Sequence, residues 1–165
     1  MKTRRKEIVR NFKTTNRPTK LYQPGINDML IGTEGGKIEH WSIDKEQCEN
    51  IYDAHPESPE GISQILEIKS SSELLIGEPN VEEFQKEFKL IATASSGAKE
   101  FRLWKLRKST VQLFPYLKIE TTIEGGIEFL LETSDTQLVA ANAKCIKFYD
   151  FIDKQKKDME ELNKK

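Results

Sequence analysis

Short apolar runs that recur along most of the chain constrain its fold more than any other feature. From Thr19 to about Ile152, runs of four to eight residues alternate with clusters of Gly, Pro, Asn, Asp and Ser. Because the runs are rich in β-branched and aromatic residues and lack helical spacing, they predict many short strands. The expected strands are Met29–Thr33, Lys37–Ile43, Glu49–Asp53, Ile62–Ile68, Lys89–Ala94, Glu100–Leu106, Tyr116–Ile123, Ile127–Glu132, Gln137–Asn142 and Cys145–Phe151.

A repeated segment links several of these strands. Thr33–Trp41, Ser96–Trp104 and Ala141–Tyr149 align without gaps on their final aromatic residue. In each segment an apolar residue lies three positions before the aromatic and a charged residue lies two before it. The aromatic residues are 63 and then 45 residues apart. An insertion over residues 70–88 accounts for the longer first spacing.

The repeat resembles the WD-repeat family, in which one strand of a blade reads apolar-charged-apolar-Trp-Asp after a Ser-x-Asp turn. Phe101–Trp104 and Ile38–Trp41 are similar to that strand, and Tyr149 is the aromatic that an Asp follows. The second spacing also matches the roughly 40–45 residues of a WD-type blade. The resemblance covers residues 20–152, and the repeats depart from the pattern at several of its positions.

In that family a His, a Ser, an Asp and the Trp form a buried hydrogen-bond chain that holds the turn of a blade. The resemblance assigns His55, Ser96 and Trp104 to this chain in the middle repeat. Ala98 stands where the Asp is expected, so the chain is incomplete. The blade-motif residues that the resemblance implies are Trp41, His55, Ser96, Trp104 and Tyr149.

The expected fold is all-β: a partial WD-type β-propeller of roughly three four-stranded antiparallel blades over residues 19–152, followed by a short C-terminal helix. The motifs give a partial blade before Ile62, one full blade, and one blade without a clear last strand. A propeller closes with roughly four to eight blades, and an open stack leaves an apolar face at each end. We expect another chain to complete the propeller, unless the sequence is the C-terminal part of a longer protein.

Three charged segments flank or interrupt the repeats, and we expect them to contact partners. Residues 1–18 form a basic flexible arm, since residues 1–20 carry eight Lys or Arg and one Glu. Residues 70–88 form an insertion loop. The charged tail, 153–165, is predicted to be helical, because the apolar residues Phe151, Ile152, Met159 and Leu162 fit one helical stripe. The candidate contact residues are Arg4, Arg5, Lys6, Glu82, Glu83 and Phe84.

The sequence offers no pattern for catalysis. Two cysteines (Cys48, Cys145) and two histidines (His40, His55) share no metal-ligand spacing, and the thiols are expected to be reduced in an intracellular protein. We expect His40 to point outward, opposite to its aromatic neighbour. Gly32–Lys37 leads into a strand rather than a helix, so it does not resemble a phosphate loop. We therefore predict no enzyme activity, no metal and no cofactor.

These observations favour a non-enzymatic interaction or scaffold subunit of a larger intracellular assembly, cytoplasmic and for example cytoskeletal or ciliary, with proteins as partners. The alternative is a nucleic-acid-associated WD-repeat protein that uses the basic arm. Against it, the net charge of −1 and the +7 of residues 1–20 leave −8 on the remaining residues. No run approaches the roughly 18 apolar residues of a membrane helix, so no membrane partner is expected.

Overall fold

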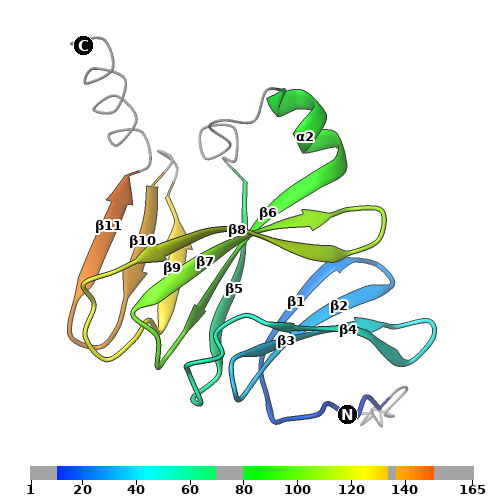
Figure 1. Cartoon of the computed structure of the whole chain (residues 1–165), viewed down its shortest axis with the longest axis horizontal. Coiled ribbons are helices and arrows are strands. Elements are labelled where there is room, and N and C mark those ends of the chain that lie inside the picture. The colour runs from blue at the N-terminus through cyan, green and yellow to red at the C-terminus, as the bar shows by residue number, and fades with distance from the viewer. Residues whose placement is uncertain (1–10, 70–79, 134–136, 151–165) are drawn as a thin grey trace, which may run out of the picture.

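The computed structural model describes residues 11–69, 80–133 and 137–150, which form three antiparallel sheets and one short helix (Figure 1). Within each sheet, every strand pairs with the strand next to it along the chain. The first sheet contains β1 (Pro18–Gly25), β2 (Asp28–Thr33), β3 (Lys37–Ser42) and β4 (Gln47–Asp53). The second contains β5 (Ile62–Ile68), β6 (Phe88–Ser95), β7 (Glu100–Arg107) and β8 (Gln112–Glu120). The third contains β9 (Phe129–Glu132), β10 (Gln137–Ala141) and β11 (Ile146–Asp150).

The second sheet lies between the other two, and each of its faces packs into a separate apolar cluster (Figure 1). The cluster between the first and second sheets includes Leu30, Ile38, Ile65, Ile91 and Trp104. The cluster between the second and third sheets includes Leu90, Phe101, Leu103, Leu130 and Leu138. Strand β5 contacts both β1 and β9, so the first strands of the three sheets are neighbours in space.

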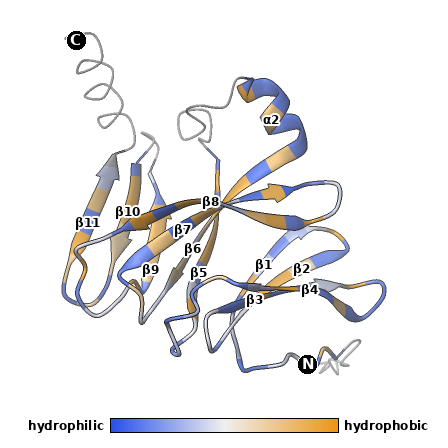
Figure 2. Ribbon diagram, viewed as in Figure 1, coloured by the Kyte–Doolittle hydropathy of each residue, from blue (hydrophilic) through white to orange (hydrophobic). Residues whose placement is uncertain are grey.

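Alternation along the strands explains this packing. In β7, alternate side chains are directed to opposite faces, and both faces are apolar because both are covered. Phe101 and Leu103 thus pack toward the third sheet, and Trp104 and Leu106 toward the first. Figure 2 shows apolar residues along the middle strands of all three sheets.

The described residues contain one strand that the sequence did not predict. Strand β1 makes the first sheet four-stranded rather than partial. The third sheet has three strands among the described residues, consistent with the missing last strand. Strand β8 ends at Glu120 and begins four residues before the predicted Tyr116.

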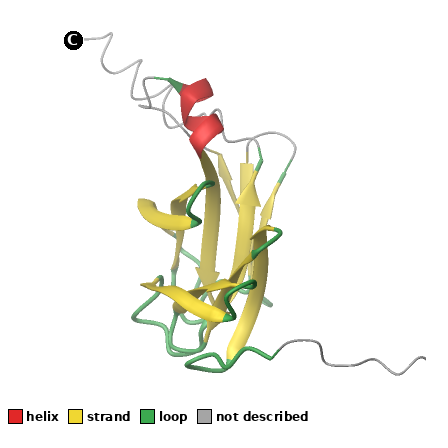
Figure 3. Cartoon of the chain, turned by 90° about the vertical axis from the view of Figure 1, so that its right-hand side faces the viewer, coloured by secondary structure: helices red, strands yellow, loops and turns green. Residues whose placement is uncertain are grey.

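The predicted insertion loop contains a short helix, α2 (Val81–Glu87), which ends where β6 begins. Asn80 caps it, because its Oδ1 accepts a hydrogen bond from the Glu83 amide at 3.1 Å. The helix lies at one end of the molecule, and many of the connecting loops gather at the opposite end (Figure 3). Three predicted features lie outside the described residues: the arm up to residue 10, the first part of the insertion, and the C-terminal helix at 153–165.

Candidate interaction surfaces

The strand registers relate the three sheets residue by residue. Trp41 pairs with Met29, Trp104 with Ile91 and Tyr149 with Leu138, so these three pairs are equivalent. The turns before the aromatic strands differ in length, since they span residues 33–37, 95–100 and 142–145. The gapless alignment of the repeated segments therefore matches structurally equivalent residues in the strand after each turn. It does not match equivalent residues in the turn or in the strand before it.

Trp104 is held by a hydroxyl group and a histidine. Its Nε1 donates to Thr93 Oγ1 at 2.9 Å, and His55 Nε2 lies 3.1 Å from the same oxygen. Because the indole already donates to Oγ1, the Thr93 hydroxyl can donate to Nε2, which suits a neutral imidazole. Burial, followed by the charge of Arg102, lowers the pKa of His55 to about 4. Thr93 supplies the hydroxyl that the resemblance assigned to Ser96, which lies three residues later, in the turn.

Trp41 is held differently, because its sheet has Ile31 at the position equivalent to Thr93. Trp41 Nε1 instead donates to Glu39 Oε2 at 2.8 Å. The other oxygen of this buried carboxylate accepts the Thr15 amide at 3.0 Å and the Thr15 hydroxyl. Phe12 completes the contact by packing edge-on against the indole, with ring centroids 5.5 Å apart. The segment before β1 thus covers the part of the outer face of the first sheet around Trp41 and Glu39.

Tyr149 occupies the equivalent position in the third sheet and has Ala140 where Thr93 stands. Its ring packs edge-on against Phe101, at 5.4 Å between centroids. Burial raises the pKa of Tyr149, and its interaction with the Thr121 side chain opposes that shift. The connection that precedes β9 therefore contacts the aromatic residue of its sheet.

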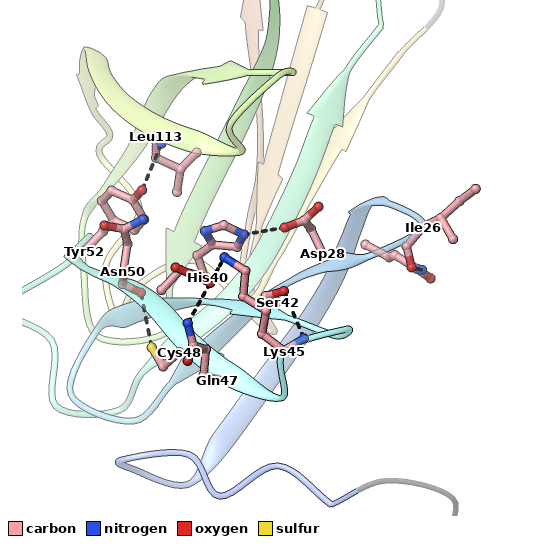
Figure 4. Close-up of polar contacts among 12 residues, drawn as sticks. Ile26, Asp28, His40, Ser42, Lys45, Gln47, Cys48, Asn50, Tyr52 and Leu113 are labelled. Carbon is pink, nitrogen blue, oxygen red and sulfur yellow. Dashed lines mark hydrogen bonds and ion pairs between the residues drawn. The ribbon is translucent and has the colours of Figure 1, made fainter.

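His40 is buried, contrary to the expectation that it points outward. Its Nε2 lies 2.7 Å from Asp28 Oδ1, and Figure 4 shows the ring beneath the second sheet. Nearby, the Tyr52 hydroxyl accepts the Leu113 amide of that sheet at 3.2 Å. The prediction that His40 and Trp41 face opposite sides of the first sheet is correct. The side that His40 faces is buried, however, because the second sheet covers it.

The outer face of the third sheet is apolar and exposed, and we name it the open face. It consists of Phe129, Leu131, Val139, Ile146 and Phe148. Four of these side chains are 60–64% exposed, and Val139 is half-buried. The open face is the last in the order of the sheets, with no further sheet beyond it among the described residues (Figure 1).

Register equivalence shows what the open face corresponds to. The positions of Ile146 and Phe148 are those of Ile38 and His40 in the first sheet. In the second sheet they are those of Phe101 and Leu103. Likewise, Leu131 and Val139 correspond to Tyr22 and Leu30, and to Leu66 and Ala92. In the first two sheets these positions pack against the sheet that follows.

The comparisons with known proteins assign no family. No family model and no curated protein matches the chain. Among solved structures, the computationally designed Ika4 protein is similar at 13% identity and a TM-score of 0.43. That match covers 89% of this chain and 99% of the designed one. The WD-repeat resemblance therefore rests on the sequence motifs.

The predicted contact residues divide into three groups. Arg4, Arg5 and Lys6 lie outside the described residues. Glu82 and Glu83 are exposed in the first turn of α2. Phe84 is 7% exposed and its ring stacks on Phe88 at 5.2 Å between centroids, so it packs within the chain.

A polar hollow of about 500 Å³ lies beside His55, at the end of the second sheet. Its charged lining residues are Glu57, Lys99, Glu100, Arg102, Lys118 and Glu120, so the two signs balance. Burial alone would raise the pKa of Glu100, but hydrogen bonds from Lys118 and Arg102 lower it overall. Over residues 11–69, 80–133 and 137–150, no group of His, Cys, Asp or Glu is arranged to hold a metal, and no helix is long and apolar enough to cross a membrane.

Proposed function

We propose that the chain is a protein-interaction module: an arc of a β-propeller whose open face seats a further β-sheet. One observation carries the proposal. Positions that are buried against the following sheet in the first two sheets keep apolar residues in the third, where they are exposed. Solvent-facing positions have no physical requirement for Leu131, Ile146 and Phe148, and exposed patches of this kind typically mark interaction sites.

The relation between sheets supports the propeller form of the proposal. Each four-stranded sheet is a simple meander, and the first strands β1, β5 and β9 lie next to one another. Blades of a propeller are arranged in this way around a central axis. Three such sheets are fewer than the roughly four to eight that close a ring. A sheet from another polypeptide would bury the open face as the second and third sheets bury the faces before them.

The test compares the wild-type chain with Ile146→Asp/Phe148→Asp, using sedimentation velocity and binding of the dye ANS. The proposal expects the wild-type chain either to associate or to bind the dye at the open face, and the double variant to do neither. Ile26→Asp is the matched control, because Ile26 is 89% exposed in the turn after β1 and lies far from the open face (Figures 1 and 4). A wild-type monomer that binds no more dye than the double variant would contradict the proposal.

A further inference from the structure

We propose that the sheet seated on the open face is the first sheet of a second copy, and that residues 1–9 of that copy add a fourth strand beside β11. Two copies would then close a ring of six sheets. This inference rests on the proposed function, since it names the partner of the open face.

The spacing between consecutive sheets supports the position of the added strand. Residues 54–61 connect β4 to β5, and residues 121–128 connect β8 to β9, so both connections have the same length. Counting the same length back from the first residue of β1, Pro18, leads to Val9. A fourth strand that ended at Val9 would therefore enter the first sheet through a connection of the usual length.

The described residues before β1 already lie as such a connection does. The connection before β5 brings His55 to the Thr93 hydroxyl that binds Trp104. The connection before β1 likewise brings Phe12 to Trp41, at 5.5 Å between ring centroids. The first sheet thus has the connection that normally arrives from a preceding sheet, although no sheet precedes it among the described residues.

The sequence of the arm matches the inward positions of the fourth strands. Tyr52 and Ile119 each lie one residue before the end of their strand, and they pair with Ile38 and Phe101. The residue one before Val9 is Ile8, which would pair with Ile146, the equivalent position on β11.

The charge of the arm fits the same register. In the first sheet, the residue before Tyr52 pairs with Glu39, the third-sheet equivalent of which is Lys147. The residue before Ile8 is Glu7, so a carboxylate would lie opposite the exposed Lys147. Opposite charges at directly paired positions favour this register.

The arm must come from a second copy. Within one chain, the segment before β1 and the third sheet lie on opposite sides of the second sheet (Figure 1). The first sheet also lacks a predecessor, since Leu21 is 60% exposed while its equivalents Ile65 and Leu130 are 6% and 5% exposed. Each copy therefore has one face that needs a following sheet and one that needs a preceding sheet. Such head-to-tail contacts form a ring when the rotation closes.

The first measurement is the mass of the full-length chain by sedimentation equilibrium. We expect a dimer of 38 kDa, twice the 19.0 kDa of one chain. Deleting residues 1–9, or introducing Ile146→Asp/Phe148→Asp, should raise the dimer dissociation constant at least 100-fold. Ile26→Asp should leave it unchanged. A monomer, or species that grow beyond two copies, would overturn the inference.

A cross-link tests the register, in a Cys48→Ser/Cys145→Ser background. One preparation carries Ile8→Cys and a second, of different mass because of a tag, carries Ile146→Cys. The mixture is oxidised with copper phenanthroline in air: two Cu(II) ions accept the two electrons lost as the S–S bond forms, the buffer takes up the two thiol protons, and dissolved oxygen reoxidises the copper. We expect a disulfide between the two preparations and none when Ile26→Cys replaces Ile146→Cys. Disulfides only between two Ile146→Cys chains would indicate a two-fold symmetric face-to-face contact and would overturn the inference.

The same measurements separate this inference from the proposed function. If the chain is monomeric but binds ANS at the open face, the open face is an interaction surface and the second copy is the wrong occupant. If the chain is monomeric and the open face binds no dye, both proposals are wrong.

Discussion

The outer faces of the first and third sheets, at the two ends of the stack, are covered to different extents. At the first sheet, residues of the same chain cover part of the outer face, with Phe12 against Trp41 and Thr15 on the buried Glu39, while Leu21 stays 60% exposed. At the third sheet, Ile146 and Phe148 are each 64% exposed. An outer face is thus compatible with an isolated chain where a neighbouring segment supplies both apolar and polar contacts. Among the described residues, no comparable segment covers the outer face of the third sheet, so its apolar side chains stay exposed.

The largest expected effects come from the aromatic anchors. Trp104→Ala should lower the free energy of unfolding by about 3–5 kcal/mol, because the indole is 4% exposed between two sheets. Trp41→Ala should cost nearly as much if the segment before β1 covers it, whereas Phe148→Ala should change stability by less than about 0.5 kcal/mol. Urea unfolding at protein concentrations below the dimer dissociation constant, where the chain is monomeric, measures all three. A Phe148→Ala effect as large as that of Trp41→Ala would contradict the difference between the two ends.

Replacing the carboxylate at the covered end should have the next largest effect. Glu39→Ala leaves the Trp41 Nε1 and the Thr15 amide without their acceptor, which should cost about 2–3 kcal/mol in urea unfolding. Glu120→Ala is the control, because the Glu120 side chain is 84% exposed. Equal effects of the two substitutions would show that Glu39 does not fasten the segment to the sheet.

Acid should lower the free energy of unfolding by protonating His55, which contacts the Thr93 hydroxyl of the second sheet. The pKa of His55 is about 4 in the folded chain and about 6.5 when unfolded, so the unfolded state binds more protons between these values. Stability from this group is complete above pH 6.5 and is lost as the pH falls toward 4. Between pH 7.5 and 5 the loss should be about 2 kcal/mol. Urea unfolding at both pH values measures it, and His55→Gln should remove this part of the pH dependence; an unchanged dependence would contradict it.

The smallest effect is expected from Phe12, which packs against Trp41 on the outer face of the first sheet. Phe12→Ala should cost about 1 kcal/mol, since it removes one edge-on aromatic contact from a half-buried side chain. The fluorescence of Trp41, measured with Trp104→Phe as the background, should shift to longer wavelength as water reaches the indole. An unchanged spectrum would indicate that other residues shield Trp41.

The sequence predicted ten of the eleven described strands, because nearly all contain an apolar run. Strand β1 was missed since its residues include two prolines, and none of its side chains is fully buried. Helix α2 has a single buried residue, Phe84, and is too short to show a helical period. These elements are fixed by their neighbours rather than by their own pattern.

The hydrogen-bond partners of the two tryptophans differ from those that the WD-repeat resemblance implied. His55 and Trp104 do share a hydrogen-bonded oxygen, but it belongs to Thr93 because the turn at residues 95–100 differs in length from the other two. Glu39 could not be found by comparing repeats, since its equivalents are Arg102 and Lys147. Its role depends on Thr15, which lies outside the repeat.

Pairing between strands that are consecutive along the chain has a consequence for folding. Most hairpins close over short turns, so they can form early and at little entropic cost. The pairing of β5 with β6 is the exception, because the chain must first close the long connection between Ile68 and Phe88. We therefore expect this pairing to form late. It completes the second sheet, and the first and third sheets can then pack on its two faces.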